Sequence, residues 1–168
     1  MAKISIYAAS AAAFTRSLTA LAAIVEKAEA DSKARKYDFN VLMQSRLAPD
    51  MLTLTGQIHL ATAFAKNTVC RLTGQTPPDF GDLEPTYDAV KARIAKTLDI
   101  IQSISESDYA GADTREIKIK VGQQDQTFTG ADYLVGFALP NFYFHVTTAY
   151  DILRHNGVQI GKRDFMGQ

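Results

Sequence analysis

Apolar residues recur at intervals of three, four or seven positions through four long segments of this chain, and this spacing limits its fold more than any other feature. Residues so spaced lie on one face of a helix, so each segment predicts an amphipathic helix. The first, residues 5–30, has its stripe at Tyr7, Phe14, Leu18, Leu21 and Val25. Four such helices can bury their apolar faces against one another, which predicts an all-α fold, a four-helix bundle.

The second predicted helix spans residues 49–73. Pro49 suits its first turn, where the missing N–H has no partner in any case, and Gly74 can end it in a left-handed conformation. Between the first two helices, residues 39–47 are rich in apolar side chains. We expect a long ordered loop there that packs against the bundle.

The other two helices are separated by a segment with a different period. The third predicted helix begins near Glu84-Pro85, and the fourth runs from Pro140, which should break or kink an earlier helix, to His155. Between them, residues 117–121 alternate isoleucine or valine with lysine, and residues 122–125 can form a turn. A period of two indicates a strand. The segment therefore predicts a small β-hairpin inserted between helices three and four.

Length, charge and cysteine content limit the class of protein. The 168 residues fit one domain, residues 1–168, and 18 basic and 18 acidic side chains leave no formal net charge. A nucleic-acid binder usually has a basic stripe, so no nucleic-acid partner is expected. No apolar run approaches the roughly 18 residues or more of a membrane span, so no membrane is expected either. Cys70 is the single cysteine and forms no disulfide within the chain, which favours a cytoplasmic location.

Three histidines are the best candidates for a site. His59 falls on the second predicted helix, His145 on the fourth, and His155 at the end of the fourth, where a histidine suits the helix dipole and is expected at the surface. His145 shares a helical face with Asn141 and Thr148. Bundles hold ligands with polar side chains that project from facing helices. Two histidines on separate helices are, however, more often hydrogen-bonded core residues than metal ligands.

Four stretches are specific enough to compare with known families. They are residues 139–145 (LPNFYFH), 152–158 (ILRHNGV), 161–165 (GKRDF) and 46–51 (RLAPDM). Together they resemble a bacterial family of unknown function within the DinB/YfiT-like superfamily of four-helix bundles. That resemblance implies an up-down four-helix bundle that is frequently dimeric and binds a divalent metal. The ligands would be one histidine from helix two and a His-x-x-x-His pair from helix four.

The resemblance assigns roles to individual residues. His145 matches the second histidine of the pair, because Arg154 and Gly157-Val158 follow it at the superfamily's spacing, and His59 would be the helix-two ligand. Asn141 stands where the first histidine of the pair would be. Catalytic zinc sites usually have three protein ligands, and an amide oxygen is a weak substitute for imidazole. We therefore expect zinc or nickel to bind weakly or not at all.

Two functions stay open. In the first, a degenerate metal or small-ligand site lies between helices two and four, with His59 and His145 as metal ligands and Asn141 and Thr148 as ligand-binding residues. In the second, the chain is a non-catalytic dimeric bundle with a stress or partner-binding role. The sequence predicts no particular reaction in either case.

A homodimer is expected in both cases. Helices one and four have more apolar and aromatic surface than one bundle interior can hide, notably Phe142, Tyr143, Phe144 and Tyr150. Exposed patches of that kind normally mark an interface.

Overall fold

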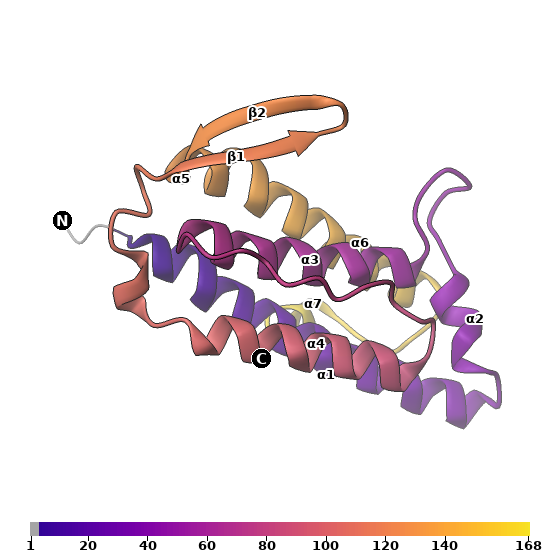
Figure 1. Ribbon diagram of the computed structural model, residues 1–168. Coiled ribbons are helices and arrows are strands. Elements are labelled where there is room, and N and C mark those ends of the chain that lie inside the picture. Colours follow the sequence, from indigo (N-terminus) through magenta and orange to yellow (C-terminus); the bar gives the residue numbers. More distant parts are fainter. Residues whose placement is uncertain (1–3) are drawn as a thin grey trace.

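A computed structural model describes residues 4–168. Within them, four long helices form a bundle (Figure 1): α1 (Ala13–Arg35), α3 (Leu54–Leu72), α4 (Tyr87–Ser103) and α6 (Leu139–His155). The predicted all-α bundle with a hairpin between its third and fourth long helices is confirmed.

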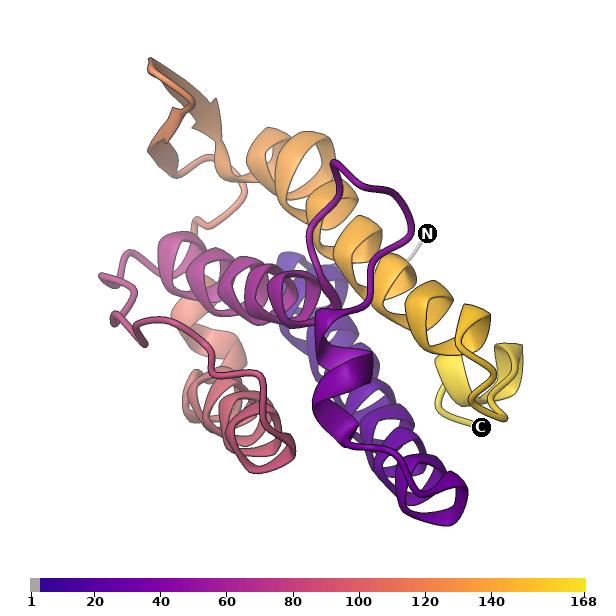
Figure 2. The same ribbon diagram turned by 90° about the vertical axis from the view of Figure 1, so that its right-hand side faces the viewer.

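The four helices do not simply alternate in direction. In Figure 1, α1 and α6 run one way and α3 and α4 the other, so the linker formed by residues 73–86 runs back along the bundle before α4 begins. Helix α3 packs against α4 and α6, and α1 packs against the same two helices. Figure 2 shows this arrangement from one end.

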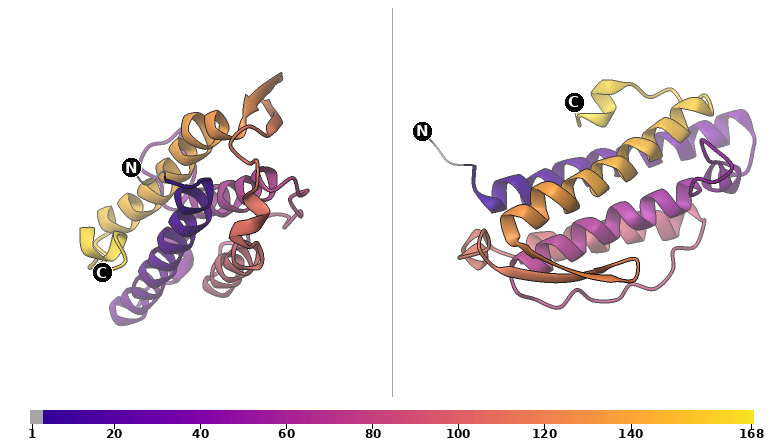
Figure 3. Two further views of the ribbon diagram at one scale, coloured as in Figure 1. Left: turned by 90° about the vertical axis from the view of Figure 1, so that its left-hand side faces the viewer. Right: turned by 90° about the horizontal axis from the view of Figure 1, so that it is seen from above.

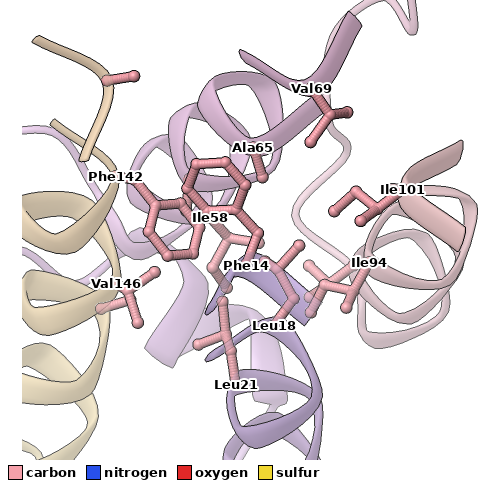
Figure 4. Packing of buried hydrophobic residues seen from close by; sticks show 14 of the residues in the cluster. Phe14, Leu18, Leu21, Ile58, Ala65, Val69, Ile94, Ile101, Phe142 and Val146 are labelled. Carbon is pink, nitrogen blue, oxygen red and sulfur yellow. The ribbon is translucent and has the colours of Figure 1, made fainter. Parts of the chain in front are cut away.

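All four helices contribute to the core (Figure 4). The rings of Phe14 on α1 and Phe142 on α6 meet edge to face, with centroids 4.7 Å apart, and neither side chain is exposed to solvent. The remaining labelled core residues are Leu18, Leu21, Ile58, Ala65, Val69, Ile94, Ile101 and Val146. The apolar stripes of the sequence are therefore the faces that the bundle buries.

Capping side chains determine where two helices begin. The Thr53 hydroxyl accepts a hydrogen bond from the N–H of Gly56, so α3 begins at Leu54. Pro49 lies in the loop before it, which corrects the expected start of this helix. Asp38 caps a short helix, α2 (Phe39–Gln44), where a loop was expected. An acidic residue directly before the apolar run was the signal for it.

The first helix is longer than predicted. The π-helical turn η1 (Ala8–Ala12) continues into α1, which ends at Arg35 with Lys36 in a left-handed conformation. The stretch Ala8–Arg35 is long and apolar enough to cross a membrane by length and composition alone, contrary to the expectation from sequence. Since 44% of its most apolar window is buried inside the bundle, a core helix is a sufficient explanation of that composition.

The hairpin pairs β1 (Glu116–Val121) with β2 (Gln124–Thr129) in antiparallel register, with Ile117 opposite Phe128. Ile117 and Ile119 are buried, while the intervening Lys118 is exposed. A short 3-10 helix, η2 (Glu106–Tyr109), precedes the hairpin. The predicted alternation is therefore the burial pattern of β1.

The chain stays helical from the hairpin to the end of α6. Helix α5 (Gly130–Tyr133) leads into the π-helical turn η3 (Leu134–Ala138) and then into α6. Pro140 lacks an N–H and would leave a carbonyl unpaired in a regular helix, and the wide turn stands directly before it. Pro140 thus lies in the first turn of α6 as predicted, but the helical path continues through it.

The C-terminal end folds back on the bundle. Asn156 caps α6, and Gly157 follows at φ 91°, as expected for a glycine after a helix. Helix α7 (Lys162–Phe165) then packs beside α1 (Figure 3, right). Asp164 on it pairs with Lys27 of α1.

Candidate functional site

His145 lies at the contact between α3 and α6. Its side chain is buried, with 7% of the residue exposed. The ring of Phe64, on α3, stacks against the imidazole at 5.7 Å between centroids and an interplanar angle of 19°. The ring of Phe144 stands nearly perpendicular to it at 5.3 Å. Two aromatic side chains therefore pack against one imidazole, one parallel to it and one perpendicular.

A glutamine determines which nitrogen of His145 has the proton. Nδ1 lies 2.7 Å from Oε1 of Gln57 on α3. The amide of Gln57 is oriented by its own Nε2, which donates to the carbonyl of Leu52 at 3.3 Å. Oε1 must therefore accept, so Nδ1–H is the donor. In the neutral ring, Nε2 then has the lone pair.

Nε2 of His145 is free to meet a ligand. Among residues 4–168, only the Tyr109 hydroxyl and Nε of Arg115 are fully enclosed side-chain polar atoms without a hydrogen bond. The one hydrogen bond of the His145 ring within that range uses Nδ1. Nε2 therefore has no partner among the described residues and keeps some exposure to solvent, and it can accept a hydrogen bond or act as a general base.

Burial lowers the pKa of His145 below its ordinary value. The charged imidazolium is disfavoured because the low-dielectric surroundings solvate it poorly. The ring is therefore neutral at neutral pH, in the state that presents the Nε2 lone pair.

This shift predicts how stability depends on pH. Below about pH 6.5, the histidine pKa of an unfolded chain, the unfolded state binds more protons than the folded state at this position. Stability should therefore be unaffected by His145 above that pH and should fall as the pH drops from about 6.5 to 5. Urea unfolding of His145→Gln should show a shallower loss over this range. A slope in His145→Gln that equals the wild-type slope would contradict the prediction.

His59 does not meet His145. It follows Gln57 by two residues, which is about 200° around the helix, and the charged groups near it are Arg93 of α4, Lys66, and Asp79 and Asp82 of the linker. Burial, and then Arg93, lower its pKa. The two histidines were expected to approach one another, but the helical phase of α3 points His59 away from His145. Gln57 has the place on α3 that the resemblance gives to His59.

Asn141 and Thr148 lie on the face of His145, as expected, but each uses its side chain within its own helix. Nδ2 of Asn141 donates to the carbonyl of Phe137 at 2.7 Å. The Thr148 hydroxyl donates to the carbonyl of Phe144, also at 2.7 Å. Such bonds orient both side chains, and their role toward a ligand stays a prediction.

His155 is at the surface as expected, and Cys70 is no candidate nucleophile. His155 is exposed in the last turn of α6. Cys70 is buried on α3, and burial raises the pKa of its thiol, so it is not the activated thiolate that nucleophilic catalysis needs.

Gln57 and Phe64 were not predicted as site residues from the sequence. Both stand on one stripe of α3 with Ala61, at intervals of four and three residues. A polar side chain within an otherwise apolar stripe was the available signal for Gln57, because buried polar groups need a partner.

The side chains present do not fit a three-ligand metal site. Within residues 4–168, no group of three histidine, cysteine, aspartate or glutamate side chains is placed to hold a metal ion. The amide of Gln57 already accepts from Nδ1 of His145, and His59 faces elsewhere. That leaves one imidazole nitrogen, where a zinc site usually has three protein ligands.

These features define a class: four-helix bundles that hold a single imidazole between two facing helices. The chain belongs to the family DUF1993, a domain of unknown function, which matches residues 6–166. It is similar to a solved structure, the crystal structure of a DinB family member protein from Shewanella denitrificans. The two are 42% identical, the match covers 97% of this chain and 92% of that one, and the TM-score is 0.91. No curated protein matches the chain. The resemblance to DinB-like bundles is confirmed.

Proposed function

We propose that this chain binds a small organic ligand directly at His145, between α3 and α6, and that zinc or nickel binds there weakly or not at all. The unpaired Nε2 of a buried, neutral imidazole supports this proposal most directly. Ligand sites of bundles lie between facing helices and combine apolar walls with a few polar groups. Phe64 and Phe144 supply the walls.

A screen of uncharged organic fragments by NMR tests ligand binding. Fragments that bind should shift the side-chain signals of His145 and the amide signal of Phe144 in a saturable manner. The same fragments should fail to bind His145→Ala, which removes the acceptor. His155→Ala, with an exposed histidine removed instead, is the matched control and should bind normally. A screen of several hundred fragments without one saturable shift at His145 would overturn the proposal.

Elemental analysis tests the metal part. Protein purified without a metal-affinity tag should contain clearly less than one equivalent of zinc or nickel, because one imidazole provides too few strong bonds. Titrated zinc should be removed by a single desalting step. Stoichiometric metal that is lost in His145→Ala but kept in His155→Ala would instead identify a true metal site.

We also propose a homodimer, for which the exposed aromatic residues of α6 give support. Phe144 is 55% exposed and Tyr143 38%, and clustered apolar surface of this kind often marks an interface. Phe142 is buried in the core and Tyr150 packs on Phe165, so these two residues no longer support the proposal. Taken alone, this surface would favour the second candidate function, that of a non-catalytic dimeric bundle with a stress or partner-binding role.

Light scattering over a wide concentration range measures the assembly. The mass should be twice that of the 18.4 kDa chain. Phe144→Asp should shift the measured mass toward that of the monomer, because it places a charge where the exposed ring was. A monomer mass at every concentration would contradict the homodimer.

A further inference from the structure

We infer that Gln57 is the positioning residue of this site and that, by holding His145 with its proton on Nδ1, it selects uncharged ligands that donate one hydrogen bond from a flat apolar body. This inference rests on the proposed function, since it names the class of ligand that the same site would take.

The assignment to Gln57 follows from its two hydrogen bonds. Its side chain is 1% exposed, and both ends of its amide are used, Nε2 toward Leu52 and Oε1 toward His145. A glutamine that is buried and hydrogen-bonded at both ends of its amide is a poor direct partner for a ligand. Without it, the single proton of a neutral imidazole is free to sit on either nitrogen. Gln57 therefore acts through His145, whose Nε2 it keeps as an acceptor.

The surroundings of His145 favour an uncharged ligand. Burial alone accounts for the lowered pKa of its imidazole, with no charged neighbour contributing. The cations of α3 and α4 that surround His59, namely Lys66 and Arg93, lie on the other side of α3. Among residues 4–168, the hydrogen-bonding and aromatic partners of the His145 ring are the neutral amide of Gln57 and the rings of Phe64 and Phe144, none of which can form an ion pair with a charged ligand.

The walls favour a flat apolar body. Phe64 lies nearly parallel to the imidazole, and Phe137 is 5.9 Å from Phe64 between centroids. The Phe144 ring stands perpendicular to the imidazole and is partly exposed to solvent. Aromatic walls stack on flat rings and meet others edge to face. A phenol-like molecule, whose O–H lies in the plane of its ring, has both required properties.

Three probes of one shape separate these properties. p-Cresol has a ring and a hydroxyl donor, 4-methylanisole has the ring without the donor, and 4-methylbenzoate replaces the donor by a negative charge. Nitrogen NMR of histidine-labelled protein at pH 7.5 reports the tautomer of His145 and the occupancy of Nε2. p-Cresol should shift the Nε2 resonance and bind about tenfold more tightly than 4-methylanisole, the effect of one hydrogen bond. 4-Methylbenzoate should not bind.

Gln57→Met tests the positioning role, because methionine keeps the length of the side chain and loses the acceptor. The variant should show a mixture of the two tautomers at His145. The ratio of its affinities for p-cresol and 4-methylanisole should fall toward one. Gln102→Met, on the exposed side of α4, is the matched control and should behave as wild type.

The possible results are distinguishable. A wild-type Nε2–H tautomer, or a tautomer unchanged in Gln57→Met, overturns the role of Gln57 whatever binds. Equal affinity for p-cresol and 4-methylanisole overturns the selectivity while the proposed ligand site stands. If none of the probes binds but fragments of another chemistry do, the ligand class is wrong and the proposed function survives. If neither probes nor fragments reach His145, the proposed function fails too.

Discussion

Replacing Gly130 by alanine should lower the free energy of unfolding by about 3 kcal/mol or more. A Cβ at this position would lie 1.7 Å from the carbonyl oxygen of Ala112 and 3.0 Å from its carbon. Those are backbone atoms, so no side-chain rotation relieves the overlap. The two segments are also tied together, because the N–H of Ala131 donates to the carbonyl of Asp113 at 2.9 Å. The start of α5 would have to separate from the segment before the hairpin.

Urea unfolding followed by circular dichroism measures this effect, with Gly136→Ala as the matched control. Gly136 lies six residues further along the same helical run, and a Cβ there meets nothing within 4 Å. Because alanine restricts the unfolded chain more than glycine does, this variant should be neutral or more stable by up to about 1 kcal/mol. Similar stabilities for the two variants would show that the 112–113 segment can move away from α5 at little cost.

The fold was predictable because it depends on a repeated pattern. The stripes of α1, α3, α4 and α6 each contain several apolar residues, so an error at one position does not move a helix. Helix starts depend on one side chain, and there Pro49 was favoured over Thr53, whose hydroxyl is the actual cap. Both residues suit a first turn, and the surrounding loop decides between them.

The site was harder to predict because it depends on helix phase. His59 and Gln57 are two residues apart, so either could belong to the site, but they point in nearly opposite directions. The resemblance to metal-binding bundles favoured His59 because imidazole is the expected ligand. The hydrogen bond between Gln57 and His145 shows instead which side of α3 faces α6. Metal affinity depends on this difference, since an amide that already accepts from Nδ1 adds little to a metal site.

Phe142→Ala should cost about 3–5 kcal/mol of unfolding free energy, because it removes a ring from a close-packed core. Phe142 has no exposed surface and lies edge to face against Phe14 at 4.7 Å. Phe14 would lose its aromatic partner across the α1–α6 contact. The neighbouring Tyr143 ring, whose centroid is 5.2 Å from that of Phe142, would also lose its aromatic contact. Equilibrium unfolding in urea, with an unchanged slope against denaturant, would give this difference directly.

Phe144→Ala is the matched control, since it makes the same change two residues along the same helix. Phe144 is 55% exposed, so its loss should alter stability by no more than about 0.5 kcal/mol in the monomer. The sequence alone does not separate these two phenylalanines, which stand in one aromatic run, but helix phase places them on different sides of α6. A cost for Phe144→Ala that grows with protein concentration would show that its ring is buried between two copies of the chain. A cost equal to that of Phe142→Ala at every concentration would contradict the exposure of Phe144 and with it the solvent-exposed wall of the proposed ligand site.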